Sequence, residues 1–197
     1  MQSVHKQVFD SIKSFEGGTI FFSEQFEYIG SNDSVRKALS RICSEGVIIR
    51  LSKGVYLNPI IDKELGVLYP SVDKVAKAIS ERDKSRIIPT GIFALNSLGL
   101  STQVPLKIIY LTDGIPRKVT VGNQTIVFRK TAPKNFAFQN KLISLIVSAL
   151  KEIGKDKITE NELEHLKGLL KREDKNVLIS DSKLAPRWIA DLILSFI

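Results

Sequence analysis

The sequence predicts an α+β fold, and three observations support this class. Near the N-terminus, apolar residues recur at helical spacing and are followed by two short strand-like runs around Ser52-Lys53-Gly54. In the middle of the chain, alternating runs flank Gly122-Asn123, a pair typical of tight hairpin turns. In the last third, the apolar residues between 140 and 153 predict a helix that is buried on most sides.

The first 60 residues contain the elements of a small domain. Val4, Val8 and Ile12 share one helix face, Ser31 or Asn32 can cap a later helix, and glycines end the helical patterns. The expected elements, in chain order, are a helix from residue 4 to 15, a strand at 19–22, a short helix at 24–29, a third helix from 32 to 45, and strands at 47–51 and 55–58. This order of helix, turn, helix and hairpin predicts a winged helix-turn-helix over residues 1–60, in which the hairpin is the wing.

A second, mixed α+β domain with a small sheet and C-terminal helices is predicted over residues 70–197. The stretch Pro59–Leu68 has no clear periodicity and is expected to be a connection between the domains. The expected elements of the second domain are helices near 72–79, 91–98, 140–153, 159–170 and 187–197, and strands at 87–88, 107–112, 118–121 and 125–129.

The composition is that of a folded globular chain, because 43% of the 197 residues are hydrophobic and 25% are charged. The N-terminus lacks the apolar segment of a signal peptide, and no apolar run approaches membrane-spanning length. We therefore expect a cytoplasmic protein with no membrane partner. Cys43 is the single cysteine, so neither an internal disulfide nor a structural zinc site with the distant His5 and His165 is expected.

The charge of the chain favours a polyanionic partner. The net charge is +8, and clustered Lys and Arg displace counterions from phosphates. Residues 1–60 as a whole are nearly neutral, with seven Lys or Arg and six Asp or Glu. Between Arg36 and Lys53, however, five basic residues are accompanied only by Glu45. The predicted third helix and wing therefore carry the local positive charge that binding to DNA needs.

Polar and basic side chains of the third helix and the wing are the predicted contacts to double-stranded DNA. In a helix-turn-helix the recognition helix enters the major groove, and groups at its N-terminus can bind a phosphate. The candidate residues are Ser31, Asn32, Ser34, Arg36, Lys37, Ser40, Arg41, Ser44, Arg50 and Lys53. The alternative is a protein-interaction module without DNA binding, in which these residues form a solvated helix face.

The sequence does not predict an enzyme, and neither a cofactor nor a metal is expected. It has no phosphate-binding loop, no nucleophile elbow and no His-Glu-x-x-His pair. Asp113 followed by Gln139-Asn140-Lys141 could mimic the acidic and Gln-x-Lys residues of metal-dependent nucleases, which is the enzymatic alternative. Asp113-Gly114 is an ordinary turn pair, however, and a single carboxylate holds Mg²⁺ weakly.

Two stretches of the chain resemble the AbiEi-type antitoxins of type IV toxin-antitoxin systems and the related AbiEi-like transcriptional regulators. The first is the wing, Leu51-Ser52-Lys53-Gly54-Val55-Tyr56-Leu57-Asn58-Pro59. The second runs from Pro89-Thr90-Gly91 through Ile109-Tyr110-Leu111-Thr112-Asp113-Gly114 to the hairpin that ends in Ile126-Val127-Phe128-Arg129.

The resemblance implies a repressor that is also an antitoxin. In such proteins the winged helix binds repeats in the promoter of its own operon, and the C-terminal domain neutralises a nucleotidyltransferase-like toxin. We expect an inverted repeat, which would bind two copies related by two-fold symmetry. The chain lacks the combination of Gly-Ser followed by an Asp-x-Asp pair that a nucleotidyltransferase needs for metal and nucleotide, so it corresponds to the antitoxin.

Overall fold

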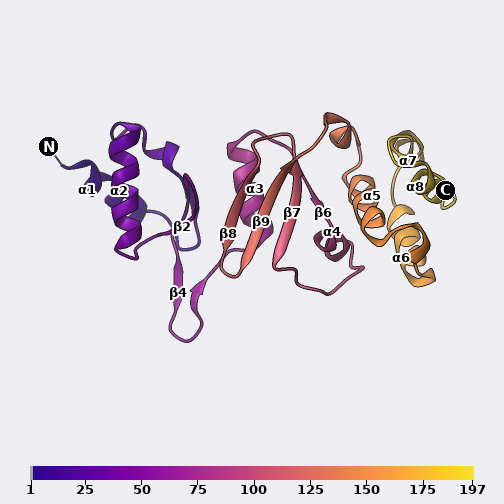
Figure 1. Ribbon diagram of the computed structural model, residues 1–197, viewed down its shortest axis with the longest axis horizontal. Helices are drawn as coiled ribbons and strands as arrows, with labels where there is room; N and C mark the ends of the chain where they lie inside the picture. Colours follow the sequence, from indigo (N-terminus) through magenta and orange to yellow (C-terminus); the bar gives the residue numbers. More distant parts are fainter. Residues whose placement is uncertain (1) are drawn as a thin grey trace. The chain divides into compact units, whose positions relative to one another are not determined.

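The computed structural model describes residues 2–197 and confirms the α+β class. The chain forms two compact units (Figure 1). The first comprises the residues up to Ala78 together with Lys118–Asn123, and the second comprises Ile79–Arg117 together with Gln124–Ile197. The domain limits of 1–60 and 70–197 stay predictions. Within residues 2–197, no helix is long and apolar enough to cross a membrane.

The N-terminal part of the first unit is a pair of helices beside a three-stranded sheet. Its elements are α1 (Val4–Lys13), β1 (Ile20–Phe22), the 3-10 helix η1 (Ser23–Phe26), α2 (Asn32–Ser44), β2 (Ile49–Ser52) and β3 (Val55–Leu57). Strand β3 lies between β1 and β2 and is antiparallel to both. Helices α1 and α2 pack together around one apolar core, to which Ile12, Leu39 and Ile42 contribute fully buried side chains.

The short helix predicted at residues 24–29 is wrong in extent, because the structure has only the four-residue η1 there. The side-chain oxygen of Gln25 accepts a hydrogen bond from the backbone N–H of Phe22 at 2.8 Å, which closes a single turn. Phe26 ends this turn in the core, with its ring edge against Phe21. Tyr28 then faces solvent with 78% of its surface exposed. A turn rather than a second regular helix therefore precedes α2.

Residues 59–68 form a hairpin instead of the predicted irregular connection. Strands β4 (Ile60–Asp62) and β5 (Gly66–Leu68) pair antiparallel. The Asp62 carboxylate accepts two hydrogen bonds from backbone N–H groups of the turn, at 2.8 and 2.9 Å, and these lower its pKa. Apolar residues of these strands face water, and Ile61 is 69% exposed. The strands therefore lack the alternation of apolar and polar residues that is typical of a half-buried strand.

Helix α3 (Val72–Arg82) precedes a four-stranded sheet. The strands are β6 (Ile87–Thr90), β7 (Lys107–Thr112), β8 (Arg117–Val121) and β9 (Gln124–Lys130), in the order β6-β7-β9-β8. Strand β7 is antiparallel to β6 and parallel to β9. Tyr110 and Ile126 are fully buried, whereas their strand neighbours Ile109 and Val127 are half-buried, so the two faces of the sheet differ in how far they are covered.

Besides β6, β7 and β9, the elements of the second unit are helices. These helices are α4 (Ile92–Ser97), η2 (Pro133–Phe136), α5 (Lys141–Ile153), η3 (Lys155–Lys157), α6 (Glu160–Leu170), α7 (Lys175–Ser182) and α8 (Arg187–Leu194). Helices α4 and α5 pack against each other and against β6. The sequence pattern does not predict α7, because its apolar residues Val177, Leu178 and Ile179 are consecutive rather than spaced by three or four.

Candidate nucleic-acid interface

Helix α2 separates an apolar face from a polar one. Val35, Ala38, Leu39 and Ile42 are all buried against the core of the first unit. These positions recur every three or four residues, so the polar residues between them share the opposite face. Ser31 caps the start of the helix by accepting a hydrogen bond from the backbone N–H of residue 34. The apolar face therefore anchors α2 and turns its polar face to solvent.

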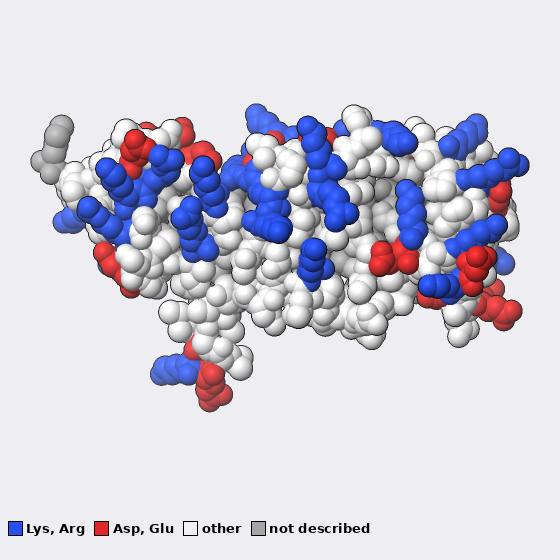
Figure 2. All heavy atoms as spheres, viewed as in Figure 1, with Lys and Arg blue, Asp and Glu red and all other residues white. Residues whose placement is uncertain are grey.

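The polar face of α2 and the hairpin carry the predicted site residues at the surface. Nine of the ten residues are exposed and Ser34 is half-buried; the nine are Ser31, Asn32, Arg36, Lys37, Ser40, Arg41, Ser44, Arg50 and Lys53. Figure 2 shows Lys and Arg side chains gathered over α2 and β2 of the first unit. Within residues 2–197, Lys37 and Arg41 have no ion-pair or hydrogen-bond partner for their side chains. Their charges are one helical turn apart and are available to a ligand.

Four of the predicted residues use part of their hydrogen-bonding capacity inside the helix. The hydroxyl of Ser34 donates to the carbonyl of Ser31 at 2.8 Å, and that of Ser44 donates to the carbonyl of Arg41 at 2.7 Å. Ser31 donates its hydroxyl hydrogen to Ser34 Oγ. Arg36 forms an ion pair with Asp33, which sequence reasoning overlooked although the two lie three residues apart on one helix face. Arg36 therefore contributes little net positive charge.

The hairpin of β2 and β3 turns through Ser52-Lys53-Gly54. Gly54 has a φ of +74°, a backbone conformation that glycine adopts without strain. A Cβ atom at this position would lie 3.1 Å from Ser23 Oγ, so the turn also needs the small residue for space. The pairing of β2 with β3 shifts in register between Arg50 and Ser52. Lys53 is exposed at the turn.

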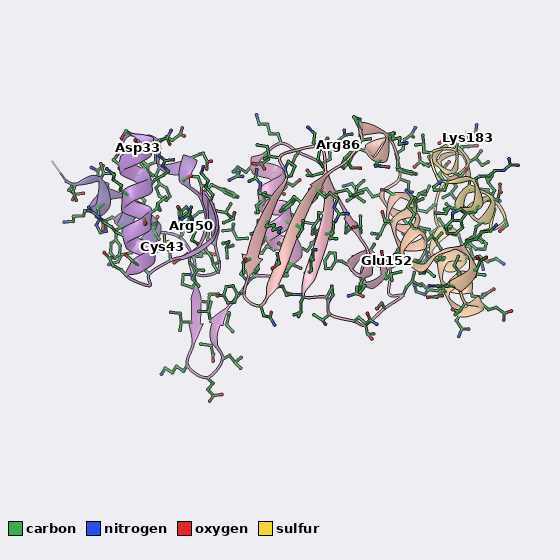
Figure 3. The ribbon with its side chains drawn as sticks, in the orientation of Figure 1. Asp33, Cys43, Arg50, Arg86, Glu152 and Lys183 are labelled. Carbon is green, nitrogen blue, oxygen red and sulfur yellow. The ribbon has the colours of Figure 1, made fainter. Side chains whose placement is uncertain are left out.

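Arg50 brings the charge of the hairpin next to α2. Burial raises the pKa of the Cys43 thiol on α2, and the Arg50 guanidinium partly counteracts this increase. Burial likewise raises the pKa of Tyr56 on β3, and both Arg50 and Arg36 act in the opposite direction. Figure 3 shows Arg50 and Cys43 close together, with Asp33 at the other end of α2. Arg50 of the hairpin therefore lies near the side of α2 that carries Cys43.

Tyr28 is a further candidate that sequence reasoning overlooked. Its ring is 78% exposed in the segment before α2, and its hydroxyl lies 3.3 Å from the hydroxyl of Ser11 on α1. An exposed aromatic residue at the start of a basic helix is the signal that could have identified it. An amphipathic ring of this kind can contact a sugar or a phosphate beside the groove.

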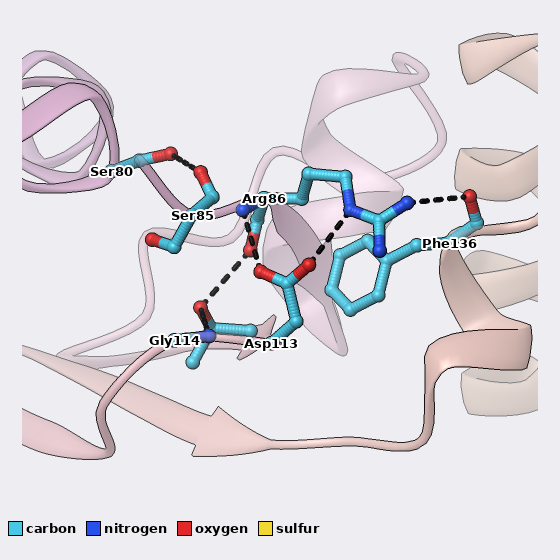
Figure 4. A network of polar contacts seen from close by, with 7 residues as sticks. Ser80, Ser85, Arg86, Asp113, Gly114 and Phe136 are labelled. Atoms are coloured by element: carbon cyan, nitrogen blue, oxygen red, sulfur yellow. Dashed lines mark hydrogen bonds and ion pairs between the residues drawn. The ribbon is translucent and has the colours of Figure 1, made fainter. Parts of the chain in front are cut away.

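The residues of the nuclease alternative lie in structural hydrogen-bond networks. Both carboxylate oxygens of Asp113 accept hydrogen bonds from Arg86, whose guanidinium also lies over the Phe136 ring (Figure 4). The backbone N–H groups of Gln139 and Asn140 donate to the buried carboxylate of Asp181. Among residues 2–197, no group of three or more His, Cys, Asp or Glu side chains is placed to hold a metal ion.

One known family matches almost the whole chain. Residues 7–178 match a family described as a family of unknown function, DUF6088. No match is found among the curated proteins. The matched range contains α2, the hairpin of β2 and β3, and the four-stranded sheet of the second part of the chain. The chain therefore belongs to the DUF6088 family.

Proposed function

We propose that residues 18–59 form a winged helix-turn-helix that binds double-stranded DNA. Helix α2 is the recognition helix, which lies in the major groove, and the hairpin of β2 and β3 is the wing, which contacts the flanking backbone. The observation that carries the proposal is the pair of exposed cations Lys37 and Arg41 on the polar face of α2, which have no partner among residues 2–197.

The residue types on α2 suit direct contacts to bases. Arg and Lys donate to the acceptors of guanine, and Ser can donate to several base edges. Asp33 neutralises Arg36, and Lys37 and Arg41 contact bases, so the phosphate contacts should come from Arg50 and Lys53 of the hairpin. Each phosphate contact contributes about 0.9 to the slope of log K against log salt concentration. We expect a slope of about −2, which corresponds to modest non-specific affinity and to specificity that depends on base contacts.

The test is a fluorescence-anisotropy titration with DNA from the region upstream of the gene, against random DNA of the same length. The double variant Lys37→Ala/Arg41→Ala should lose affinity for the upstream DNA by about fivefold to 150-fold for each residue replaced, because each base contact contributes about 1–3 kcal/mol. The matched control is Lys63→Ala/Lys74→Ala, which removes the same charge from exposed positions outside the interface. Equal losses in both double variants, or no preference for the upstream DNA, would contradict base recognition by α2. Pulldown of a protein that depends on Lys37 and Arg41 without DNA would favour the interaction module.

We further propose that the protein represses its own operon in the cytoplasm and acts as the antitoxin of a nucleotidyltransferase-like toxin. This proposal rests on the resemblance to AbiEi-type proteins at Leu51–Pro59, which is the wing, and at 89–129, which spans β6 to β9. Expression of the neighbouring gene alone should arrest growth, and co-expression of this chain should restore it. The Lys37→Ala/Arg41→Ala variant should still restore growth while a promoter fusion becomes derepressed, because the two roles use different parts of the chain. Growth arrest that this chain does not relieve would contradict the antitoxin role.

A further inference from the structure

The second unit contains a pocket of about 340 Å³ on one face of its sheet. Strands β6, β7 and β9 form the floor, where Ile88, Ile109 and Leu111 present half-buried apolar side chains. Helix α5 forms a wall with the small residues Ser144 and Ser148, which leave the space that larger side chains would fill. The volume lies at the lower end of the range for small-molecule sites, about 300–1,000 Å³.

The pairing of the strands sets the length of the pocket. Arg129 pairs with Leu111 across the parallel strands, and Lys107 lies four residues before Leu111 on β7. At about 3.3 Å per residue, Lys107 and Arg129 are therefore separated by about 13 Å along the strands. Strand β6 runs in the opposite direction, so Gly91 lies at the Lys107 end.

Helix α5 runs along the same pocket. A Cβ atom on Gly91 would lie 3.7 Å from a carboxylate oxygen of Glu152, so the C-terminal turn of α5 lies at the Lys107 end. Lys151 therefore belongs to this end as well, and Ser144 lies about 10 Å back along the helix, toward Arg129. Figure 3 shows Glu152 beside α4 and α5. The pocket thus has Lys107, Lys151 and Glu152 at one end and Arg129 at the other.

The charges around the pocket are not balanced by the protein. Within residues 2–197, neither Lys107, Arg129 nor Lys151 forms an ion pair, and Glu152 is the single carboxylate in the lining. Each end of the pocket therefore carries a net positive charge, while the floor between the ends is apolar. Figure 2 shows Lys and Arg side chains over this face of β7, β9 and α5. Cations that line a concave surface raise the local concentration of anions.

We propose that this pocket binds a small organic anion of the nucleoside bisphosphate class, which carries two phosphates on one sugar and a flat base beside them. Arg129 contacts one phosphate, and Lys107 with Lys151 contacts the other. The hydroxyls of Ser144 and Ser148 donate hydrogen bonds to the ligand, and Glu152 accepts one from a ligand hydroxyl or amino group. The apolar floor packs against the base of the ligand.

The test is calorimetric titration of the full chain with adenosine 3′,5′-bisphosphate, AMP, adenosine and inorganic phosphate. We expect the bisphosphate to bind at least tenfold more tightly than AMP, because the second phosphate gains charge-assisted hydrogen bonds. Adenosine and inorganic phosphate should bind at least tenfold more weakly than AMP. The proposal would be overturned if adenosine or inorganic phosphate bound as tightly as the bisphosphate, or if the bisphosphate did not bind at 1 mM.

Two pairs of variants locate the ligand. Arg129→Gln should weaken bisphosphate binding by about tenfold or more, whereas Lys130→Gln should bind as the wild type does, because neighbouring strand residues point to opposite faces. Lys151→Gln should weaken binding similarly, and Lys141→Gln on the same helix should not. Equal losses within either pair would overturn the assignment. The Lys37→Ala/Arg41→Ala variant should bind the bisphosphate normally, so failure of this proposal and failure of the proposed DNA binding can be distinguished.

Discussion

Replacement of Asp113 by alanine removes the acceptor at the centre of the network in Figure 4. Asp113 accepts hydrogen bonds from the backbone N–H and from Nε of Arg86, at 2.7 and 2.8 Å, and its side chain is 28% exposed. A hydrogen bond to a charged group contributes about 1.5–3 kcal/mol, and a partly exposed ion pair contributes less than about 1 kcal/mol. We therefore expect Asp113→Ala to lower the free energy of unfolding of the second unit by about 2–3 kcal/mol.

Tryptophan fluorescence provides the assay, because Trp188 is the single tryptophan and lies in α8 of the same unit. Urea unfolding at pH 7 should show the full loss for Asp113→Ala. Asp113→Asn should lose about half as much, since the amide oxygen still accepts from the backbone N–H but carries no charge. The control is Glu164→Ala, which removes an exposed carboxylate from α6 and should change the free energy of unfolding by less than about 0.5 kcal/mol.

The dependence on pH provides a second check. The backbone N–H of Arg86 is the main cause that holds the pKa of Asp113 below its usual value. A carboxyl group whose pKa is lower in the folded state stabilises the fold above the pKa of the unfolded chain, about 4, and loses this contribution as the pH falls through the folded value. The difference between wild type and Asp113→Ala should be constant from about pH 8 to 5 and decrease below about pH 4. A loss under about 0.5 kcal/mol at pH 7, or a difference that persists unchanged to pH 3, would refute the reasoning. Stabilisation by Mg²⁺ that disappears in Asp113→Ala would instead favour the nuclease hypothesis.

Three further predictions concern a buried carboxylate, a turn and a thiol. Asp181→Ala should lower the free energy of unfolding of the second unit by about 2–4 kcal/mol, measured by the same fluorescence, because it leaves two backbone N–H groups at the start of α5 without an acceptor. Gly54→Ala should destabilise the first unit by about 1–2 kcal/mol in a circular-dichroism melt. The loss should exceed that of the control Gly46→Ala, because Gly46 has a similar φ but no atom within 4 Å of the added Cβ. Equal losses would show that the contact with the neighbouring hydroxyl is unimportant. Burial raises the pKa of Cys43, so the reaction of its thiol with a disulfide reagent should be slow at pH 7 and accelerate with rising pH. Arg50→Gln should shift this acceleration to still higher pH, because the Arg50 guanidinium lowers the pKa of the thiol. A reaction that is fast at pH 7 would contradict the raised pKa.

The elements of the first unit could be predicted where local pattern determines structure. The face of α2 is set by apolar residues that recur at helical spacing, and the turn at Gly54 is set by a backbone conformation that few residues adopt without strain. The prediction failed at η1 and at the hairpin of β4 and β5. At η1 a single side chain, Gln25, closes the turn, and in the hairpin apolar residues such as Ile61 remain exposed. Neither feature produces a periodic signal.

The electrostatics of the candidate interface could be predicted only in part. The exposure of Lys37 and Arg41 follows from the period of the helix, but the neutralisation of Arg36 by Asp33 depends on which rotamers the two side chains adopt. Arg50 and Cys43 are seven residues apart in the sequence and lie on two different elements. Arg50 comes near the thiol, and so lowers its pKa, only when the hairpin folds back. A count of charges along the chain therefore indicates where the candidate interface lies but overestimates its net charge.

The pocket of the second unit shows why some candidate sites have no recognisable sequence motif. Lys107, Arg129 and Lys151 come from three elements that are separated by about twenty residues each, and no motif connects them. They share one pocket because β7 and β9 pair in parallel, in the register that places Arg129 opposite Leu111. A shift of that register by one residue would turn Arg129 to the other face of the sheet and leave Phe128 in the pocket. The proposed site is thus a consequence of long-range pairing, and the matched variants Arg129→Gln and Lys130→Gln test which face of β9 contacts the ligand.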